Sequence, residues 1–176
     1  MAGHARLRAA RIGTVHARTT PAHYTRYRMK KTILLADGDD AVRGTLARVL
    51  ELEQYEVVLA ACGSQAAEKL LNCLPALALC DLELPGDADG PGLDALCEVA
   101  PGVPLVLITA RSHQYNRARQ LGASALMEKP LHLPLLLRTI RNLVSEPRNE
   151  WLRRLTEPGF KTLFLHHSAP SRLGAV

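Results

Sequence analysis

The sequence predicts an α/β fold in which a parallel sheet of five strands has helices on both of its faces. Between residues 31 and 146, short and mostly apolar segments alternate with amphipathic ones. Strands that are apolar throughout are typical of parallel sheets, because the connecting helices cover both faces of such a sheet. The alternation occurs five times, which indicates a doubly wound arrangement in a single domain.

Each predicted element follows from its own residue pattern. Strands are assigned to short apolar or β-branched runs, and helices to segments with apolar residues three or four positions apart. The predicted strands are Ile33–Ala36, Tyr55–Ala60, Leu77–Cys80, Val103–Ile108 and Ser124–Glu128, and the predicted helices are Asp40–Glu53, Gln65–Cys73, Leu93–Val99, Gln114–Leu121 and Leu133–Val144.

Several helix ends carry recognisable signals. Asp40 is expected to cap the first helix and Ser64 the second, because short polar side chains accept hydrogen bonds from the free N–H groups there. Pro75 ends the second helix, and Gly122 ends the fourth. The loop Gly86–Gly92, rich in Gly and Asp, leads into the short third helix.

The positive charge of the chain is confined to its first residues. The net charge is +5, but residues 1–36 alone contribute +8 and the remainder contributes −3. Residues 1–30 lack helix or strand periodicity and are expected to form a disordered leader. A targeting peptide or a nucleic-acid-binding arm is the alternative, and translation starting at Met29 is another.

Residues 147–176 are expected to be a C-terminal tail and not a second domain, since several Pro and Gly interrupt them. Two stretches of this tail, Trp151–Leu155 and Lys161–Leu165, are apolar enough to dock onto the core. This leaves residues 31–146 as the one predicted domain.

Composition favours a cytoplasmic protein without membrane contact. No apolar run approaches the roughly 18 residues that a spanning helix requires. The four cysteines show no C-x-x-C pairing, so they are expected to be reduced and mostly buried. They are Cys62, Cys73, Cys80 and Cys97.

Four of the predicted strands are followed by a polar residue. These are Asp37, Asp81, Thr109 and Lys129. The carboxyl ends of parallel strands lie along one edge of the sheet, where such folds place their sites. Two acids, a hydroxyl and an amine are therefore expected to converge, and Asp81 is the most informative because a Pro-Gly turn follows it closely.

This arrangement resembles the receiver domain of response regulators in two-component signalling, over residues 31–146. The resemblance implies a flavodoxin-like sheet with strand order 2-1-3-4-5. It rests on four segments, each at the end of a predicted strand: ILLADGDDAVR (33–43), LALCDLELPG (77–86), LITAR (107–111) and GASALMEKP (122–130).

The resemblance implies a role for each of the polar residues. Asp81 is the expected phosphoacceptor, while the ammonium of Lys129 and the hydroxyl of Thr109 would contact the transferred group. Mg²⁺ is the expected cofactor, since it prefers oxygen ligands and keeps several of its waters. Its ligands would be Asp37, Asp81 and the backbone carbonyl of Glu83.

Some features depart from the pattern of the family. Gly38 stands where the family has a second acid that binds the metal, and Asp39 beside it is an additional candidate ligand. Leu126 replaces an aromatic residue that the family often has, and the loop Gly86–Gly92 is longer than usual. The Lys129–Pro130 peptide bond is expected to be cis, as X–Pro bonds allow at modest cost.

The sequence thus predicts a signalling domain and not an enzyme. A sensor histidine kinase or phosphotransfer protein would phosphorylate Asp81, and an unidentified output protein would bind the altered surface. Homodimerisation is compatible with this function, and no nucleic-acid-binding domain is recognisable. One alternative is a degenerate receiver that acts as a docking module without phosphorylation. A remote alternative is a phosphatase like the haloacid dehalogenases, suggested by Asp37-Gly38-Asp39, in which Asp81 would have no role.

Overall fold

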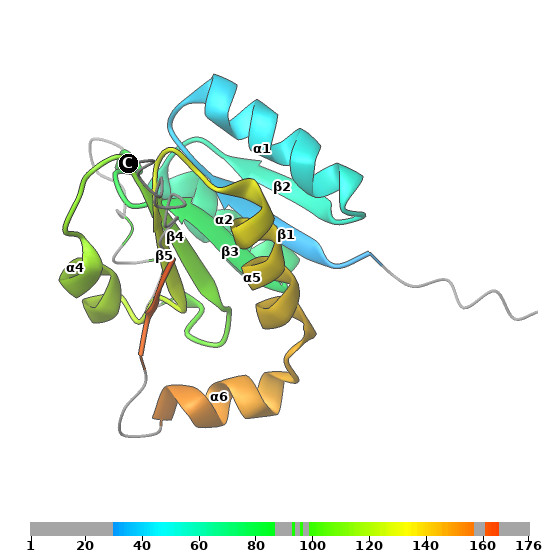
Figure 1. The fold of residues 1–176 in the computed structure, drawn as a ribbon. Helices are drawn as coiled ribbons and strands as arrows, with labels where there is room; N and C mark the ends of the chain where they lie inside the picture. The colour runs from blue at the N-terminus through cyan, green and yellow to red at the C-terminus, as the bar shows by residue number, and fades with distance from the viewer. Residues whose placement is uncertain (1–29, 87–92, 94–95, 97–98, 157–160, 166–176) are drawn as a thin grey trace, which may run out of the picture.

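In the computed structural model, six strands form one parallel sheet with the order β2-β1-β3-β4-β5-β6 (Figure 1). The structure describes residues 30–86, 93, 96, 99–156 and 161–165. The predicted leader and most of the predicted third helix lie outside this part. The strands are β1 Thr32–Ala36, β2 Glu56–Ala60, β3 Leu77–Asp81, β4 Leu105–Thr109, β5 Ala125–Glu128 and β6 Leu163–Leu165. The helices are α1 Asp40–Leu52, α2 Gly63–Cys73, α4 Tyr115–Gln120, α5 Leu133–Ser145 and α6 Arg148–Thr156.

The predicted α/β fold and the order of its first five strands are confirmed, but the predicted number of strands is wrong. The sixth strand, β6, comes from the segment that the sequence places in a tail, and it pairs in parallel with β5. The preceding helix α6 lies beneath the amino ends of the strands, at the opposite end of the sheet from the loops that follow β1 and β3 (Figure 1). The C-terminal segment is therefore part of the fold.

Two apolar cores hold the helices against the sheet. Helices α1 and α5 cover one face, where α6 also contributes its tryptophan, and α2 and α4 cover the other (Figure 1). Central strands β3 and β4 are buried along their whole length, as expected for strands covered on both faces. This rigid sheet fixes where each strand ends, and hence where its terminal polar residue lies.

The predicted caps of the first two helices are wrong by one or two residues. Asp39, in extended backbone, caps α1 through Oδ1, which accepts hydrogen bonds from the N–H groups of Ala41 at 2.8 Å and Val42 at 3.1 Å. Helix α2 begins at Gly63 with Cys62 as its N-cap residue, so Ser64 lies inside the helix. The N-cap is the residue whose backbone is extended before the first helical residue, and this is Asp39 in α1 and Cys62 in α2.

The three cysteines that the structure describes are free, and their exposure differs. Cys80 is buried in β3, Cys62 is half-buried and Cys73 is exposed at the end of α2. The prediction of mostly buried cysteines is therefore wrong for Cys73. Cys97 lies outside the described residues.

None of the described helices is both long and apolar enough to cross a membrane.

Candidate functional site

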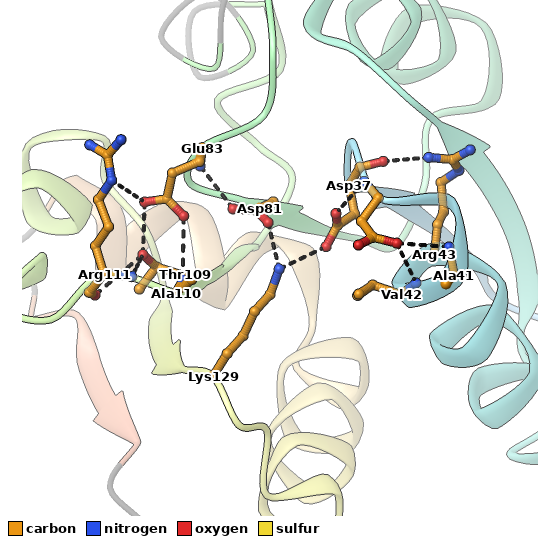
Figure 2. A network of polar contacts seen from close by, with 11 residues as sticks. Asp37, Ala41, Val42, Arg43, Asp81, Glu83, Thr109, Ala110, Arg111 and Lys129 are labelled. Atoms are coloured by element: carbon orange, nitrogen blue, oxygen red, sulfur yellow. Dashed lines mark hydrogen bonds and ion pairs between the residues drawn. The ribbon is translucent and has the colours of Figure 1, made fainter.

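The site lies at the carboxyl ends of the central strands (Figure 2). Asp37 follows β1, Asp81 is the last residue of β3, Thr109 is the last residue of β4, and Lys129 follows β5. Asp37, Asp81 and Thr109 are buried, with exposed fractions of 1%, 8% and 0%. The sequence predicted the convergence of these four residues at one edge, and three of them touch.

Lys129 joins the two acids. Its Nζ donates hydrogen bonds to Asp81 Oδ2 at 2.6 Å and to Asp37 Oδ2 at 3.1 Å (Figure 2). The backbone around it is fixed, because Lys129 N donates to Thr109 O at 2.7 Å and the Lys129–Pro130 bond is cis, as predicted. The ammonium offsets the repulsion between two buried carboxylates.

The same contacts keep both charged groups ionised. Burial raises the pKa of Asp81, but hydrogen bonds from Lys129 and Glu83 and the charge of Lys129 outweigh it, so this pKa lies below its ordinary value. Burial likewise lowers the pKa of Lys129, but Asp81 and Asp37 outweigh it, so the pKa of the lysine lies above its ordinary value. At neutral pH the site therefore holds a carboxylate that can act as a nucleophile beside an ammonium.

The backbone orients Asp81. Its Oδ1 accepts a hydrogen bond from the N–H of Glu83 at 2.8 Å, while Oδ2 faces Lys129. A turn immediately after β3 makes this possible, since Leu84 N donates back to Asp81 O at 3.2 Å. One oxygen is held by the chain, and the other faces the group that would stabilise negative charge.

Thr109 contacts neither acid and instead binds Glu83. Its Oγ1 donates to Glu83 Oε1 at 2.8 Å and accepts from Arg111 N at 2.9 Å. Arg111 Nε lies 3.8 Å from the same Glu83 oxygen (Figure 2). The side chain of Glu83 thus engages the hydroxyl that the sequence assigns to a transferred group.

The sequence did not indicate this role of the Glu83 side chain. Glu83 and Thr109 are 26 residues apart, and no local pattern joins them. The signal that could have found the contact is the position of Glu83 two residues after Asp81, where a tight turn brings its side chain back toward the neighbouring strand end.

Gly38 occupies a tight place beside the loop after β3. A Cβ at position 38 would lie 3.0 Å from Pro85 Cδ and 3.2 Å from Pro85 Cγ. The side chain of a second acid would therefore have to displace Pro85. Asp39, the other candidate ligand, uses Oδ1 to cap α1.

Arg43 is a further contributor that the sequence did not single out. Its Nη1 donates to the backbone carbonyl of Asp37 at 2.6 Å (Figure 2). Its Nη2 lies 2.6 Å from Asp40 Oδ1. The guanidinium thereby ties the first turn of α1 to the end of β1 and holds the backbone of Asp37 in place.

The donor set for a metal ion is small but chemically suitable. Among the described residues, no three His, Cys, Asp or Glu side chains are grouped so that they could hold a metal ion. Asp37 and Asp81 offer two carboxylates that already share one cation, Lys129. Oxygen ligands of this kind fit Mg²⁺, which takes one or two carboxylates and completes its shell with water.

The comparisons with known proteins agree with this geometry. The protein-family model described as the response regulator receiver domain matches residues 33–141. The chain belongs to the response regulator receiver family. Receiver domains are signalling modules.

Individual relatives each match between 67% and 70% of this chain. The transcriptional regulatory protein PdtaR of Mycobacterium tuberculosis is 33% identical over 123 residues, which are 67% of this chain and 58% of that protein. A CheY-like receiver domain protein from Methanospirillum hungatei has a TM-score of 0.59 and 29% identity, covering 70% of this chain and 98% of that one. A response regulator from Burkholderia pseudomallei, solved with a phosphorylated aspartic acid, a calcium ion and citrate, has a TM-score of 0.55 and 25% identity, covering 69% of this chain and 72% of that one.

Proposed function

We propose that this receiver accepts a phosphoryl group on Asp81 from a sensor histidine kinase or a phosphotransfer protein. The observation that carries the proposal is the contact between Asp81 and Lys129 at 2.6 Å, because it pairs an ionised carboxylate with a fixed ammonium. The Burkholderia relative, which was solved with a phosphorylated aspartic acid, supports the same chemistry.

In the proposed reaction a carboxylate oxygen of Asp81 attacks the phosphorus of a phosphohistidine. An O–P bond forms, the N–P bond breaks, and the histidine nitrogen keeps the electron pair of that bond. Lys129 stabilises the negative charge on the phosphoryl oxygens as the transfer proceeds. The product is an acyl phosphate on Asp81.

Thr109 must change partner for its predicted role. Its hydroxyl donates to Glu83 in this structure, and it can donate to a phosphoryl oxygen only after leaving that carboxylate. Arg111, which lies 3.8 Å from Glu83 Oε1, can then pair with the carboxylate alone. Phosphorylation would in this way alter the loop between β4 and α4.

The carboxylates of Asp37 and Asp81 and the backbone carbonyl of Glu83 are the proposed ligands of Mg²⁺, with Asp39 as an additional candidate. When bound, the ion would neutralise negative charge on the phosphoryl group. Asp37 Oδ1 accepts a hydrogen bond from the N–H of Asp39 at 2.9 Å and Oδ2 accepts one from Lys129 at 3.1 Å, so both oxygens are already oriented by the protein.

The wider context is proposed on the same basis. The partners are a cytoplasmic phosphodonor protein and an unidentified output protein, and residues 31–146 are the receiver itself. This chain spans 58% of the length of PdtaR. The output activity of PdtaR is therefore not assigned to this chain.

The decisive experiment is the intact mass of the protein after incubation with acetyl phosphate and Mg²⁺. One phosphoryl adduct is expected, and it should be absent from Asp81→Asn and from a sample treated with EDTA. Asp40→Asn is the matched control, because it neutralises an exposed acid nearby and should leave the adduct in place. Equal modification of Asp81→Asn would contradict the assignment.

A second candidate is a docking module that works without phosphorylation. It is favoured by one observation, the close packing of Gly38 against Pro85, because a third acid at position 38 would require Pro85 to shift. If neither acetyl phosphate nor a phosphorylated histidine donor modifies Asp81, this second function replaces the first.

A further inference from the structure

Strand β6 covers the edge of β5 that would otherwise be open. The pairing starts where Leu163 N donates to Ser124 O at 2.9 Å. It is only three residues long, with the register Ala125↔Leu163, Leu126↔Phe164 and Met127↔Leu165. A short strand at the edge of a sheet contributes few backbone hydrogen bonds, so side-chain contacts must help to hold it.

Phe164 makes the most specific of these contacts. It lies beside Leu126 on the same face of the sheet, and both belong to the core that α4 helps to cover. Its ring packs edge-on against Tyr115 with centroids 6.2 Å apart and an angle of 65° between the ring planes. An aromatic pair in this geometry contributes beyond its buried area.

Tyr115 is the first residue of α4, and the loop before it leads directly to the site. Two N–H groups of that loop reach the residues described above: Ala110 N donates to Glu83 Oε2 at 3.4 Å and Arg111 N to Thr109 Oγ1 at 2.9 Å. The path from Asp81 through Glu83 and the loop to β6 is therefore continuous.

Strain within this loop makes it suited to movement. His113 has φ of +62°, in the left-handed region that residues with a Cβ adopt at a cost. Its N–H donates to Glu128 Oε1 at 3.2 Å, which ties the loop to the end of β5. Loss of either anchor, at Thr109 or at Glu128, would favour a relaxed backbone.

The contact between β6 and β5 also contains unfavourable features. Ser124 Oγ and Thr162 Oγ1 are buried at the start of the pairing without a hydrogen-bond partner among the described residues. Buried hydroxyls in that state oppose docking. Leu163 is 52% exposed, so it contributes little apolar burial in return.

We infer that β6 is a displaceable strand whose attachment to β5 depends on the contacts of Thr109 and Glu83. The trigger rests on the proposed phosphorylation of Asp81. When the Thr109 hydroxyl leaves Glu83, the loop relaxes, Tyr115 shifts and Phe164 loses its ring partner.

Hydrogen exchange measured by mass spectrometry on the full chain tests this coupling without phosphorylation. Thr109→Val removes the hydroxyl and keeps the shape of the side chain. It should raise the exchange rates of the β6 amides by about fivefold or more, while the amides of β1 and β3 stay protected. In a Phe164→Leu background the same substitution should add nothing, because the ring contact is already lost.

Leu163→Ala is the matched control, since it alters β6 at an exposed position and should leave the response to Thr109→Val intact. Unchanged β6 exchange in Thr109→Val would overturn the inference. A uniform increase across β1, β3 and β6 would overturn it as well, because that pattern means general destabilisation and not release of one strand.

A second arm uses acetyl phosphate and Mg²⁺, with the mass of the intact chain measured on the same sample. Faster β6 exchange in the modified protein supports the inference. An adduct on Asp81 with unchanged β6 exchange would reject the inference and leave the proposed function standing. Absence of an adduct would count against the proposed function, and Thr109→Val would still decide whether β6 is coupled to the site.

Discussion

At the scale of the residue, Lys129 determines the charge balance of the site. It is the cation in contact with both Asp37 and Asp81. Lys129→Met is expected to lower the free energy of unfolding at pH 7 by about 1–3 kcal/mol, because the substitution leaves two buried carboxylates unpaired. Urea unfolding of the variant and the wild type at pH 7 and pH 5 measures the loss.

The direction of the pH effect follows from the pKa shifts. The pKa of Asp81 is lowered in the folded protein, so its contribution to stability is present above the unfolded pKa and is lost as the pH falls through the folded pKa. The pKa of Lys129 is raised, so its contribution is present below its unfolded pKa and is lost as the pH rises through the folded pKa. In Lys129→Met the carboxyl of Asp81 loses the partner that lowers its pKa, while the burial that raises this pKa remains, so the deficit should shrink at pH 5. A deficit of the same size at both values would contradict this account.

Gly38 and Pro85 pack closely beside the proposed metal site. Gly38→Asp would add a carboxylate, but its Cβ would lie 3.0 Å from Pro85 Cδ. The double variant Gly38→Asp/Pro85→Ala is therefore expected to bind Mg²⁺ more tightly than Gly38→Asp alone. Isothermal titration calorimetry of the two variants and of Pro85→Ala compares the affinities. Equal Mg²⁺ affinities of Gly38→Asp and Gly38→Asp/Pro85→Ala would mean that Pro85 shifts at little cost in free energy.

At the scale of the element, Asp39 is the N-cap residue of α1. Asp39→Ala is expected to lower the free energy of unfolding by about 1 kcal/mol, since it removes the acceptor for two N–H groups at the helix start. The exposed neighbour Asp40 pairs with Arg43 and accepts no N–H bond at the helix start among the described residues, so Asp40→Ala should cost clearly less. Thermal and urea unfolding of both variants make the comparison. A larger loss for Asp40→Ala would mean that Asp40 caps the helix, as the sequence predicted.

The sequence predicted the elements better than it predicted their ends. The first five strands are short, mostly apolar runs, which the sequence makes easy to recognise. In the structure their ends lie within two residues of the expected bounds. A helix start is decided by backbone angles at one residue, and Asp39 and Asp40 are chemically equal candidates for it. β6 is harder still, because three residues, Leu163–Leu165, become a strand only where the edge of β5 accepts them.

The same limit applies to the site. Asp37, Asp81 and Lys129 could be brought together from sequence because each follows a strand of one parallel sheet. The contact of Thr109 with Glu83 could not, since it depends on how a turn redirects one side chain. Contacts between strand ends follow from topology, whereas contacts made by loops require the loop geometry itself.

At the scale of the whole molecule, α6 and β6 join the receiver as parts of its core. Trp151 of α6 is 2% exposed and packs with the residues that α1 and α5 bury against the sheet. It also lines a cavity of about 160 Å³ together with Leu70 and Cys80 from the opposite face. The side chain of Trp151 therefore packs in one core and lines a cavity with residues of the other, at the amino end of the sheet.

Trp151→Ala is accordingly expected to lower the free energy of unfolding by about 3–5 kcal/mol, as for other buried aromatic residues. Leu152→Ala, at the next position of α6, removes a side chain that is 43% exposed and should cost less than about 0.5 kcal/mol. Urea unfolding followed by circular dichroism measures both variants without relying on the fluorescence of the substituted tryptophan. Similar small losses in both would mean that α6 is an appendage, and that the receiver is complete without it. A large loss confined to Trp151→Ala would make the C-terminal segment part of the folding unit, since its helix would then stabilise the sheet that carries Asp81.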